Sequence, residues 1–158
     1  MQQNTPYHTP LYRDALAQIG IPTPWAFGLA DRTRFGELDA LSHVNNTAYL
    51  RWLENFRIGY FREYGLSDYQ GTPPRLVLKS IGMEFRKEMV LHEDYVVTGR
   101  TSAFRTSSFT MDYAVWAGDL RATGQAVIVW LTQDGHKMPI PDPLRTVFVD
   151  RDGARDDR

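Results

Sequence analysis

The chain has 158 residues, a length that fits one domain with a hydrophobic core of ordinary size. Its formal net charge is -1, so the composition shows no basic excess and no nucleic-acid partner is expected. The absence of cysteine excludes disulfides, thiol nucleophiles and cysteine-ligated metals. The first residues lack a signal-peptide pattern, and no apolar run reaches the roughly 20 residues that cross a bilayer. We therefore expect a cytoplasmic protein without a membrane partner.

The beginning of the chain predicts one short helix followed by one strand. Residues 9–20 can form a helix that ends before two closely spaced prolines. Residues 1–24 are therefore interpreted as an N-terminal extension that carries a short helix. Beyond them, Trp25 and Phe27 alternate with smaller residues, which is typical of a half-buried strand, and this strand would run towards Asp39.

The strongest helical pattern in the chain begins at Asn46. From there, large apolar side chains recur at helical spacing and form a wide stripe: Tyr49, Trp52, Leu53, Phe56, Tyr60 and Tyr64. Asn45 or Asn46 is suited to cap the first turn, and Gly65 stands where a C-terminal capping glycine is expected. We predict one long amphipathic helix, with Tyr49 and Trp52 lining either the core or an acyl tunnel.

The remainder of the chain predicts strands joined by short turns. One face of the first of these strands is expected to carry Val77, Ile81, Met83 and Phe85. Alternation of apolar residues continues through residues 95–102 and 109–115, and Gly118 indicates a hairpin turn. Residues 122–131 are apolar on both faces, so we expect this strand near the centre of the sheet.

Together these elements indicate an α+β fold. One long helix can cover one face of an antiparallel sheet, so a strongly curved antiparallel sheet wrapped around that helix satisfies the pattern. The domain is expected to span residues 25–148 without an internal linker. Residues 149–158 are charged and nearly free of apolar side chains, which predicts a disordered tail.

A motif lies directly before the long helix. It reads Asp39-Ala-Leu-Ser42-His43-Val-Asn45-Asn46, after Phe35-Gly-Glu37-Leu and before Thr47-Ala-Tyr49-Leu, with Trp52 and Glu54 following. This stretch resembles the 4-hydroxybenzoyl-CoA thioesterase family, more narrowly its bacterial long-chain acyl-CoA thioesterases and the related acyl-ACP thioesterases. Weaker matches are Arg86-Lys-Glu-Met-Val90 followed by Asp94, and Pro139-Ile-Pro141. The resemblance covers residues 25–148 and implies a hot-dog-fold acyl-CoA thioesterase that needs no metal or organic cofactor.

The residues of the motif suit thioester hydrolysis. The reaction needs a group that attacks the carbonyl or activates water, and donors for the developing oxyanion. The first turn of a helix offers unpaired backbone N–H groups, and the amides of Asn46 and Thr47 are expected there. By resemblance, Asp39 is the catalytic carboxylate and the Asn46 amide polarises the thioester carbonyl. Members of the family use this carboxylate as general base or as nucleophile, and we favour the general base.

Other motif residues have more than one interpretation. His43 either hydrogen-bonds within the loop and braces the start of the helix, or it orients Asp39 or the substrate. Asn45 is interpreted as a capping or bracing residue. Glu54 is a secondary candidate for the catalytic carboxylate, because some hot-dog thioesterases use a glutamate on the helix.

Two positions depart from the family pattern. Ser42 stands where glycine is usual, so the loop backbone is expected to differ slightly from that of the family. Leu41 stands where plant-type acyl-ACP thioesterases carry a functional asparagine. This second departure favours CoA esters over acyl-ACP as the substrate.

The resemblance also implies partners. Candidates for contacts to the CoA phosphates are Arg86, Lys87, Arg105 and Lys137, although for each residue taken singly solvated surface charge is the favoured interpretation. The four histidines are scattered without paired ligand spacing, so no metal site is predicted. The family pairs two protomers into one continuous sheet, which removes an open sheet edge. A homodimer or a dimer of dimers is therefore expected.

Two functions of other kinds are alternatives. A non-catalytic module of the same fold would bind acyl-CoA or acyl-ACP without turnover, although the presence of Asp39 argues against it. A hydratase or dehydratase acting on an acyl thioester is less favoured, because those relatives carry a different motif. The aromatic stripe does not distinguish a fatty acyl group from an aryl group.

Overall fold

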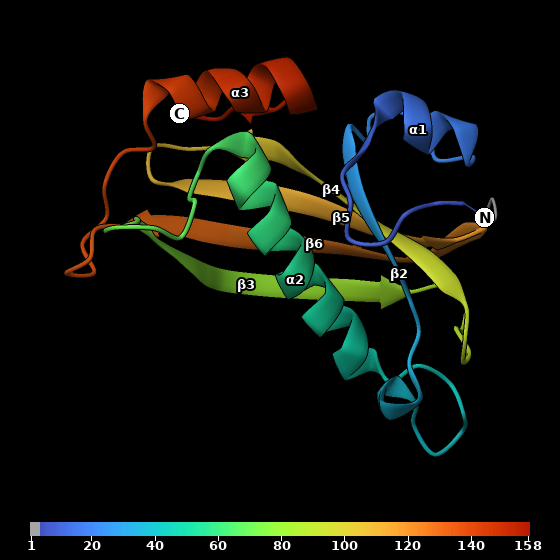
Figure 1. The fold of residues 1–158 in the computed structure, drawn as a ribbon. Coiled ribbons are helices and arrows are strands. Elements are labelled where there is room, and N and C mark those ends of the chain that lie inside the picture. The colour runs from blue at the N-terminus through green and yellow to red at the C-terminus, as the bar shows by residue number, and fades with distance from the viewer. Residues whose placement is uncertain (1–3) are drawn as a thin grey trace.

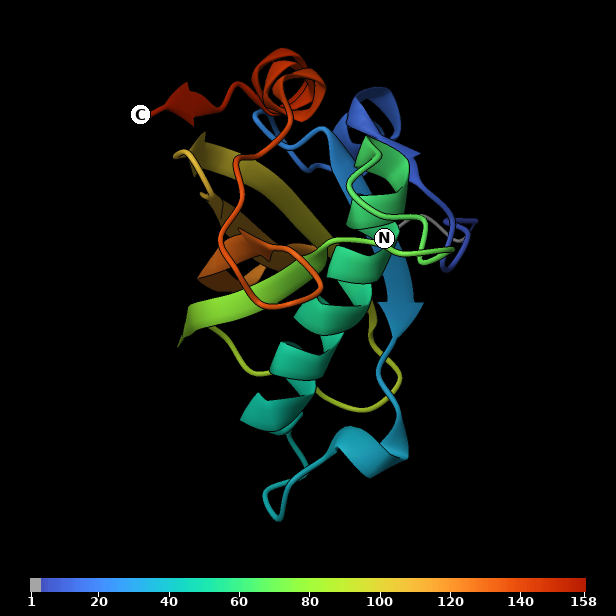
Figure 2. The same ribbon diagram turned by 90° about the vertical axis from the view of Figure 1, so that its left-hand side faces the viewer.

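The computed structural model describes residues 4–158, and in it one curved sheet carries a long helix across its concave face (Figures 1 and 2). In chain order the elements are β1 (Leu11–Tyr12), α1 (Arg13–Gln18), β2 (Phe27–Arg32), the 3-10 turn η1 (Phe35–Glu37), α2 (Asn46–Tyr64), β3 (Arg75–Phe85), β4 (Asp94–Phe104), β5 (Ser108–Ala117), β6 (Asp119–Leu131), α3 (Asp142–Asp152) and β7 (Arg155–Asp156). The strands lie in the order β1-β2-β4-β5-β6-β3, each antiparallel to its neighbours, and β7 pairs with β4 in parallel. The predicted α+β arrangement is confirmed.

Helix α2 begins and ends at the caps that the sequence indicates. Asn45 is the N-cap residue, and its side-chain oxygen accepts a hydrogen bond of 3.0 Å from the Thr47 amide. Gly65 ends the helix in the left-handed conformation, with φ of 82°. Leu53 and Tyr60 of the apolar stripe are fully buried against the sheet. Burial of a large apolar side chain contributes about 1.5–3 kcal/mol, so packing of this stripe stabilises the helix.

Two glycines allow α2 to lie close to the sheet. A Cβ atom added at Gly99 of β4 would lie 2.3 Å from the Phe56 ring, and one added at Gly59 would lie 2.8 Å from the Leu29 side chain of β2. Such distances are strongly repulsive in a close-packed interior. The two glycines therefore set the depth of α2 and, with it, the position of its N-terminal end.

Two predictions for the later strands need correction. A register shift between Leu78 and Ser80 places an extra residue in β3, so Val77 and Ile81 point to opposite faces of the sheet. The prediction that Val77 shares a face with the other apolar residues of this strand is therefore wrong. Strand β6, expected near the centre of the sheet, lies between β5 and the edge strand β3.

The N-terminal extension covers part of the outer face of the sheet. Helix α1 has six residues, Arg13–Gln18, and is shorter than the predicted helix over residues 9–20. Its Leu16 is fully buried in a small second core with Ala30 and Val96, on the face opposite α2. Residues 1–3 of the extension lie outside the described residues.

The C-terminal tail is ordered, which contradicts the predicted disorder of residues 149–158. These residues complete α3 and form β7. Asp152 of α3 is 3% exposed, and its carboxylate accepts hydrogen bonds from Tyr60, Tyr64 and the Thr101 amide. Disorder was predicted from the high content of charged residues. The composition does not reveal that buried donors elsewhere in the chain satisfy the Asp152 carboxylate.

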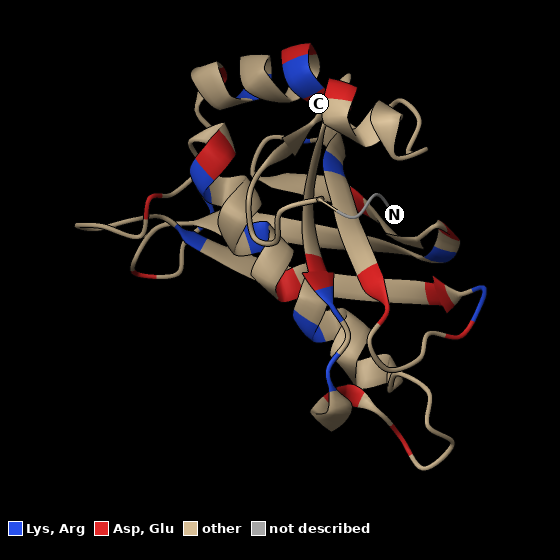
Figure 3. Ribbon diagram, turned by 45° about the vertical axis from the view of Figure 1, so that its right-hand side comes forward, with Lys and Arg blue, Asp and Glu red and all other residues tan. Residues whose placement is uncertain are grey.

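Charged side chains are distributed over the whole chain. Figure 3 shows Lys and Arg interspersed with Asp and Glu on the helices, strands and turns. Within residues 4–158, no helix is long and apolar enough to cross a membrane.

Candidate active site

The motif that precedes α2 forms one side of a cleft of about 580 Å³, here called the Asp39 cleft. It is lined by Asp39, His43, Val44, Asn46, Tyr49, Phe85, Arg86, Lys87 and Glu88. The loop before α2 extends beyond the sheet at the N-terminal end of the helix (Figure 1), and the end of β3 with the following turn supplies the opposite side. Hollows of about 460 and 860 Å³ on the outer face of the sheet contain none of the motif residues.

The loop holds Asp39 in a fixed orientation. Its Oδ1 atom accepts hydrogen bonds from the Leu41 amide at 2.9 Å and the His43 amide at 3.2 Å. The Asp39 amide in turn donates to the His43 carbonyl at 2.8 Å. The other carboxylate oxygen, Oδ2, has no hydrogen-bond partner among residues 4–158. One oxygen therefore anchors the side chain, and the second is available to a water molecule or a substrate.

Ser42 adopts the conformation that glycine favours. Its φ is 62°, in the left-handed region that non-glycine residues rarely occupy. Its amide donates to the Asp39 carbonyl at 3.0 Å and closes the turn. Ser42 therefore adopts a left-handed conformation that glycine takes more readily, and a difference from the loop of the family stays a prediction.

The first turn of α2 presents one free amide to the Asp39 cleft. The Thr47 amide is bound by the Asn45 side chain, and the Thr47 hydroxyl donates to the same oxygen at 3.0 Å. Thr47 does not line the cleft either, so the expectation that it offers a free amide is wrong. The Asn46 amide has no hydrogen-bond partner in the described part of the chain, and Asn46 lines the cleft. This leaves one donor at the positive end of the helix dipole.

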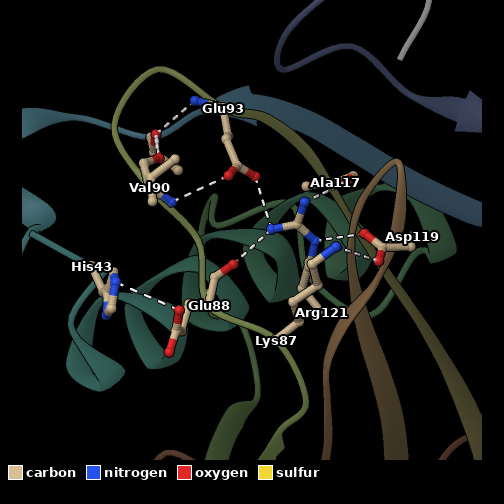
Figure 4. Close-up of polar contacts among 9 residues, drawn as sticks. His43, Lys87, Glu88, Val90, Glu93, Ala117, Asp119 and Arg121 are labelled. Atoms are coloured by element: carbon tan, nitrogen blue, oxygen red, sulfur yellow. Dashed lines mark hydrogen bonds and ion pairs between the residues drawn. The ribbon is translucent and has the colours of Figure 1, made fainter.

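The contacts of His43 are consistent with its bracing role in the loop, and a role of its side chain towards the substrate stays a prediction. Its backbone braces the loop through Asp39, whereas its side chain is 33% exposed and lines the cleft. The Nε2 atom lies 3.5 Å from a carboxylate oxygen of Glu88 (Figure 4). Glu88 was not among the predicted site residues, although it lies within the weakly matching turn after β3. Its separation from His43 along the chain hides the contact.

The four cations expected to contact CoA separate into two pairs. Arg86 and Lys87 line the Asp39 cleft, and Lys87 forms an ion pair of 3.1 Å with Asp119. Arg105 lies in the turn between β4 and β5, and Lys137 pairs with the last residue of β6. These two residues are at the opposite end of the sheet. One chain therefore brings only Arg86 and Lys87 to the site.

Of the two aromatic residues at the start of α2, one lines the Asp39 cleft and the other does not. Tyr49 is 3% exposed and lines the cleft, and burial raises the pKa of its phenol to about 12. Trp52 stacks on Tyr95 with ring centroids 4.0 Å apart and does not line this cleft. Glu54, the alternative carboxylate, is exposed on α2 outside the cleft. Tyr49 thus remains in contact with the site as a neutral phenol, while Trp52 belongs to the packing beneath it.

The geometry agrees with the comparison with known proteins. The sequence matches the thioesterase-like superfamily over residues 33–148. The chain belongs to this superfamily. The resemblance to 4-hydroxybenzoyl-CoA-type thioesterases is thereby confirmed, and the hot-dog fold with it. Within residues 4–158, this superfamily member has no cluster of three or more His, Asp or Glu side chains that could hold a metal ion.

Three solved structures illustrate the relationship. A thioesterase superfamily protein from Jannaschia sp. CCS1 is 52% identical, with 96% of this chain and 98% of that chain covered and a TM-score of 0.91. A thioesterase from Thermus thermophilus, solved with coenzyme A and Zn, is 30% identical over 80% of this chain and 93% of that chain, with a TM-score of 0.70. A 1,4-dihydroxy-2-naphthoyl-CoA thioesterase from Synechocystis shares the fold at 19% identity and a TM-score of 0.70, covering 80% of this chain and 97% of that chain.

Proposed function

We propose that this chain hydrolyses the thioester bond of an acyl-CoA to give a carboxylic acid and CoA. The observation that carries the proposal is that Asp39, with one free carboxylate oxygen, and Asn46, with a free backbone amide, line the same cleft. Membership of the superfamily supports thioester hydrolysis in general. Coenzyme A bound to the Thermus relative, together with Leu41 in place of asparagine, supports CoA as the carrier.

In this proposal Asp39 is a general base. Its Oδ2 atom takes a proton from a water molecule, whose oxygen attacks the thioester carbonyl carbon. The Asn46 amide donates a hydrogen bond to the developing oxyanion, which the positive end of the α2 dipole also stabilises. When the intermediate collapses, the carbon–sulfur bond breaks, the carboxylic acid forms, and the proton on Asp39 passes to the departing thiolate. The hydrogen bonds to Oδ1 hold the carboxylate in place and leave Oδ2 available for this role.

Arg86 is proposed to attract the CoA phosphates. An Arg86→Glu change is expected to raise the KM for acyl-CoA by about tenfold, the effect of losing roughly 1.4 kcal/mol of phosphate interaction. Hydrolysis of the corresponding acyl-N-acetylcysteamine, which has no phosphate, is expected to be unaffected. Arg13→Glu is the matched control, because Arg13 is exposed in α1 and does not line the Asp39 cleft. Equal losses with both substrates would contradict a phosphate-binding role.

Strand β3 is proposed to pair with a second copy of the chain. It has 11 residues, and among the described residues it pairs only with β6, so its other edge has unpaired backbone groups. The opposite edge of the sheet ends in β1, which has two residues. Antiparallel pairing of two β3 strands would bring the Arg75 end of one, beside Lys137, towards the Phe85 end of the other. This arrangement would return Lys137 to the CoA site from the second protomer.

The oligomeric state tests this pairing. We expect sedimentation equilibrium to give about twice the chain mass of 18.2 kDa, or four times that mass for a dimer of dimers. A Val77→Lys change places a charge on the edge strand and is expected to shift the protein towards the monomer. Val149→Lys is the control, because Val149 is also exposed but lies on α3. A wild-type monomer at micromolar concentration would contradict the proposal.

Release of free CoA tests the proposed function itself. The chain has no cysteine, so a thiol reagent detects CoA without a protein background. Short, medium and long acyl-CoAs and an aryl-CoA form the substrate panel, and the same acyl groups on acyl carrier protein test the carrier. Turnover of at least one CoA ester is expected. Tight acyl-CoA binding without turnover would instead favour the non-catalytic binding module, and an enoyl product would favour a hydratase or dehydratase.

A further inference from the structure

A buried arginine lies behind the turn that faces the catalytic motif. Arg121 is near the start of β6, and its side chain is 10% exposed. Its guanidinium binds two carboxylates, Asp119 at 2.7 Å and Glu93 at 2.9 Å. It also donates to two carbonyls, Glu88 at 2.7 Å and Ala117 at 3.0 Å (Figure 4). One side chain thus joins the β5–β6 hairpin to the turn between β3 and β4, residues 86–93, here called the β3–β4 turn.

The backbone of Arg121 holds the same turn. Its carbonyl accepts hydrogen bonds from the Arg86 amide at 2.8 Å and the Lys87 amide at 3.2 Å. The side chain then fixes the Glu88 carbonyl in the middle of the turn and the Glu93 carboxylate at its end. The hydrogen bonds to the Asp119 and Glu93 carboxylates are strengthened because both partners are ionised. A planar guanidinium can bind several acceptors at once, which the ammonium group of lysine cannot do in the same geometry.

The β3–β4 turn contacts the catalytic motif at two points. The Met89 carbonyl accepts a hydrogen bond of 2.8 Å from the Val44 amide, two residues before Asn46. The Glu88 carboxylate lies 3.5 Å from His43, and its side chain is 73% exposed. No other polar contact of the Glu88 carboxylate occurs within residues 4–158. The position of this carboxylate therefore depends on the backbone that Arg121 holds.

We propose that Arg121 is a positioning residue for the candidate active site: it fixes the β3–β4 turn so that Glu88 meets His43 and Met89 holds the start of α2. The expected effect on kcat rests on the proposed function, whereas the structural role of Arg121 does not depend on it. A displacement of about 1 Å at a reacting group can lower a rate by about 100-fold. Loss of the guanidinium is therefore expected to lower kcat without removing any group that contacts the substrate.

The first arm of the test compares two arginines of equal burial. Arg121→Met is expected to lower kcat by about 10- to 100-fold in protein shown to be folded by circular dichroism. Arg145→Met is the matched control, because Arg145 is 11% exposed and also binds one carboxylate and one carbonyl, but on α3. It is expected to leave kcat within twofold of the wild type. Arg121→Lys, which keeps the charge without the planar head, provides a milder variant should Arg121→Met fold poorly.

A double-mutant cycle separates positioning from general stabilisation. If Arg121 acts through Glu88, then Glu88→Gln lowers kcat in the wild-type background but has little further effect in the Arg121 variant. Additive effects, or a folded Arg121 variant with a kcat within twofold of the wild type, would overturn the proposal.

Hydrogen exchange gives a readout that does not depend on catalysis. Backbone amides of residues 39–46 are expected to exchange faster in the Arg121 variant than in the Arg145 variant. Equal exchange in the two variants would overturn the positioning role. A wild-type protein that turns over no thioester would refute the proposed function, while the exchange comparison would still decide whether Arg121 holds the motif.

Discussion

Replacing Asp39 by asparagine is expected to lower kcat for acyl-CoA hydrolysis by about 10²- to 10⁴-fold while leaving the fold intact. Asparagine has nearly the shape of aspartate, and its side-chain oxygen can still accept the hydrogen bonds from the Leu41 and His43 amides. The atom in place of Oδ2 becomes an NH₂ group, which donates and cannot take a proton from water. Release of CoA measures the loss, and circular dichroism with a thermal melt measures the fold.

A second aspartate of the chain provides the control for this change. Asp68 also accepts a hydrogen bond from the amide two residues later, that of Gln70, at 2.9 Å. It lies in the loop after α2 and does not line the Asp39 cleft. Asp68→Asn is expected to leave kcat unchanged. If Asp39→Asn also turned over substrate at the wild-type rate, Asp39 would not be the base, and the assignment of the cleft would fail.

The largest effect on stability is expected at Asp152. Its carboxylate accepts hydrogen bonds of 2.5 Å from the Tyr60 hydroxyl, 2.6 Å from the Tyr64 hydroxyl and 2.8 Å from the Thr101 amide. An Asp152→Ala change leaves these three buried donors without their acceptor. The expected loss in free energy of unfolding is roughly 2–4 kcal/mol, because each unsatisfied buried group costs about 1–3 kcal/mol and the structure relaxes around part of the gap. Urea unfolding measures it.

The pH dependence of this loss has a definite sign. Burial raises the pKa of Asp152 above its ordinary value, although the hydrogen bonds from Tyr60 and Tyr64 oppose the shift. A carboxyl with a raised folded-state pKa contributes most stability below its unfolded pKa of about 3.9, and this contribution declines as the pH rises through the folded value. The difference between wild type and Asp152→Ala should therefore be larger at pH 4 than at pH 8.

Asp150→Ala is the control for the change at Asp152. Asp150 is an exposed residue of the same helix, so its loss is expected to alter the free energy of unfolding by less than about 0.5 kcal/mol. A similarly small effect at Asp152 would show that its carboxylate does not hold the C-terminal segment to α2 and β4.

The Asp39 motif and the beginning of α2 could be predicted because the residues that specify them are close together in the sequence. The period of the apolar stripe and the caps at Asn45 and Gly65 specify α2, and the motif places Asp39 immediately before it. Hydrogen bonds that span short stretches of chain can be expected from such patterns. The engagement of the Thr47 amide was the exception, because the N-cap side chain satisfies one specific donor of the first turn.

The remaining features depend on contacts between distant parts of the chain. Val77 changes face because of a bulge that the alternation of residues does not reveal. The tail is ordered by the buried Asp152, whose donors lie 51 to 92 residues away in the chain. Glu88 contacts the motif, and Arg121 acts on it, only because the fold places the β3–β4 turn beside the motif. No single-sequence pattern contains these pairings.

Hydrolysis in H₂¹⁸O shows whether water cleaves the thioester in the proposed reaction of the Asp39 cleft. Under multiple turnovers of an acyl-CoA from the panel, mass spectrometry should find one ¹⁸O atom in each carboxylic acid released, with one free CoA thiol for each acid. Asp39→Asn should abolish nearly all of both products. CoA release without labelled acid, or labelled acid formed at the same rate by the Asp39 variant, would contradict the proposed hydrolysis at this cleft.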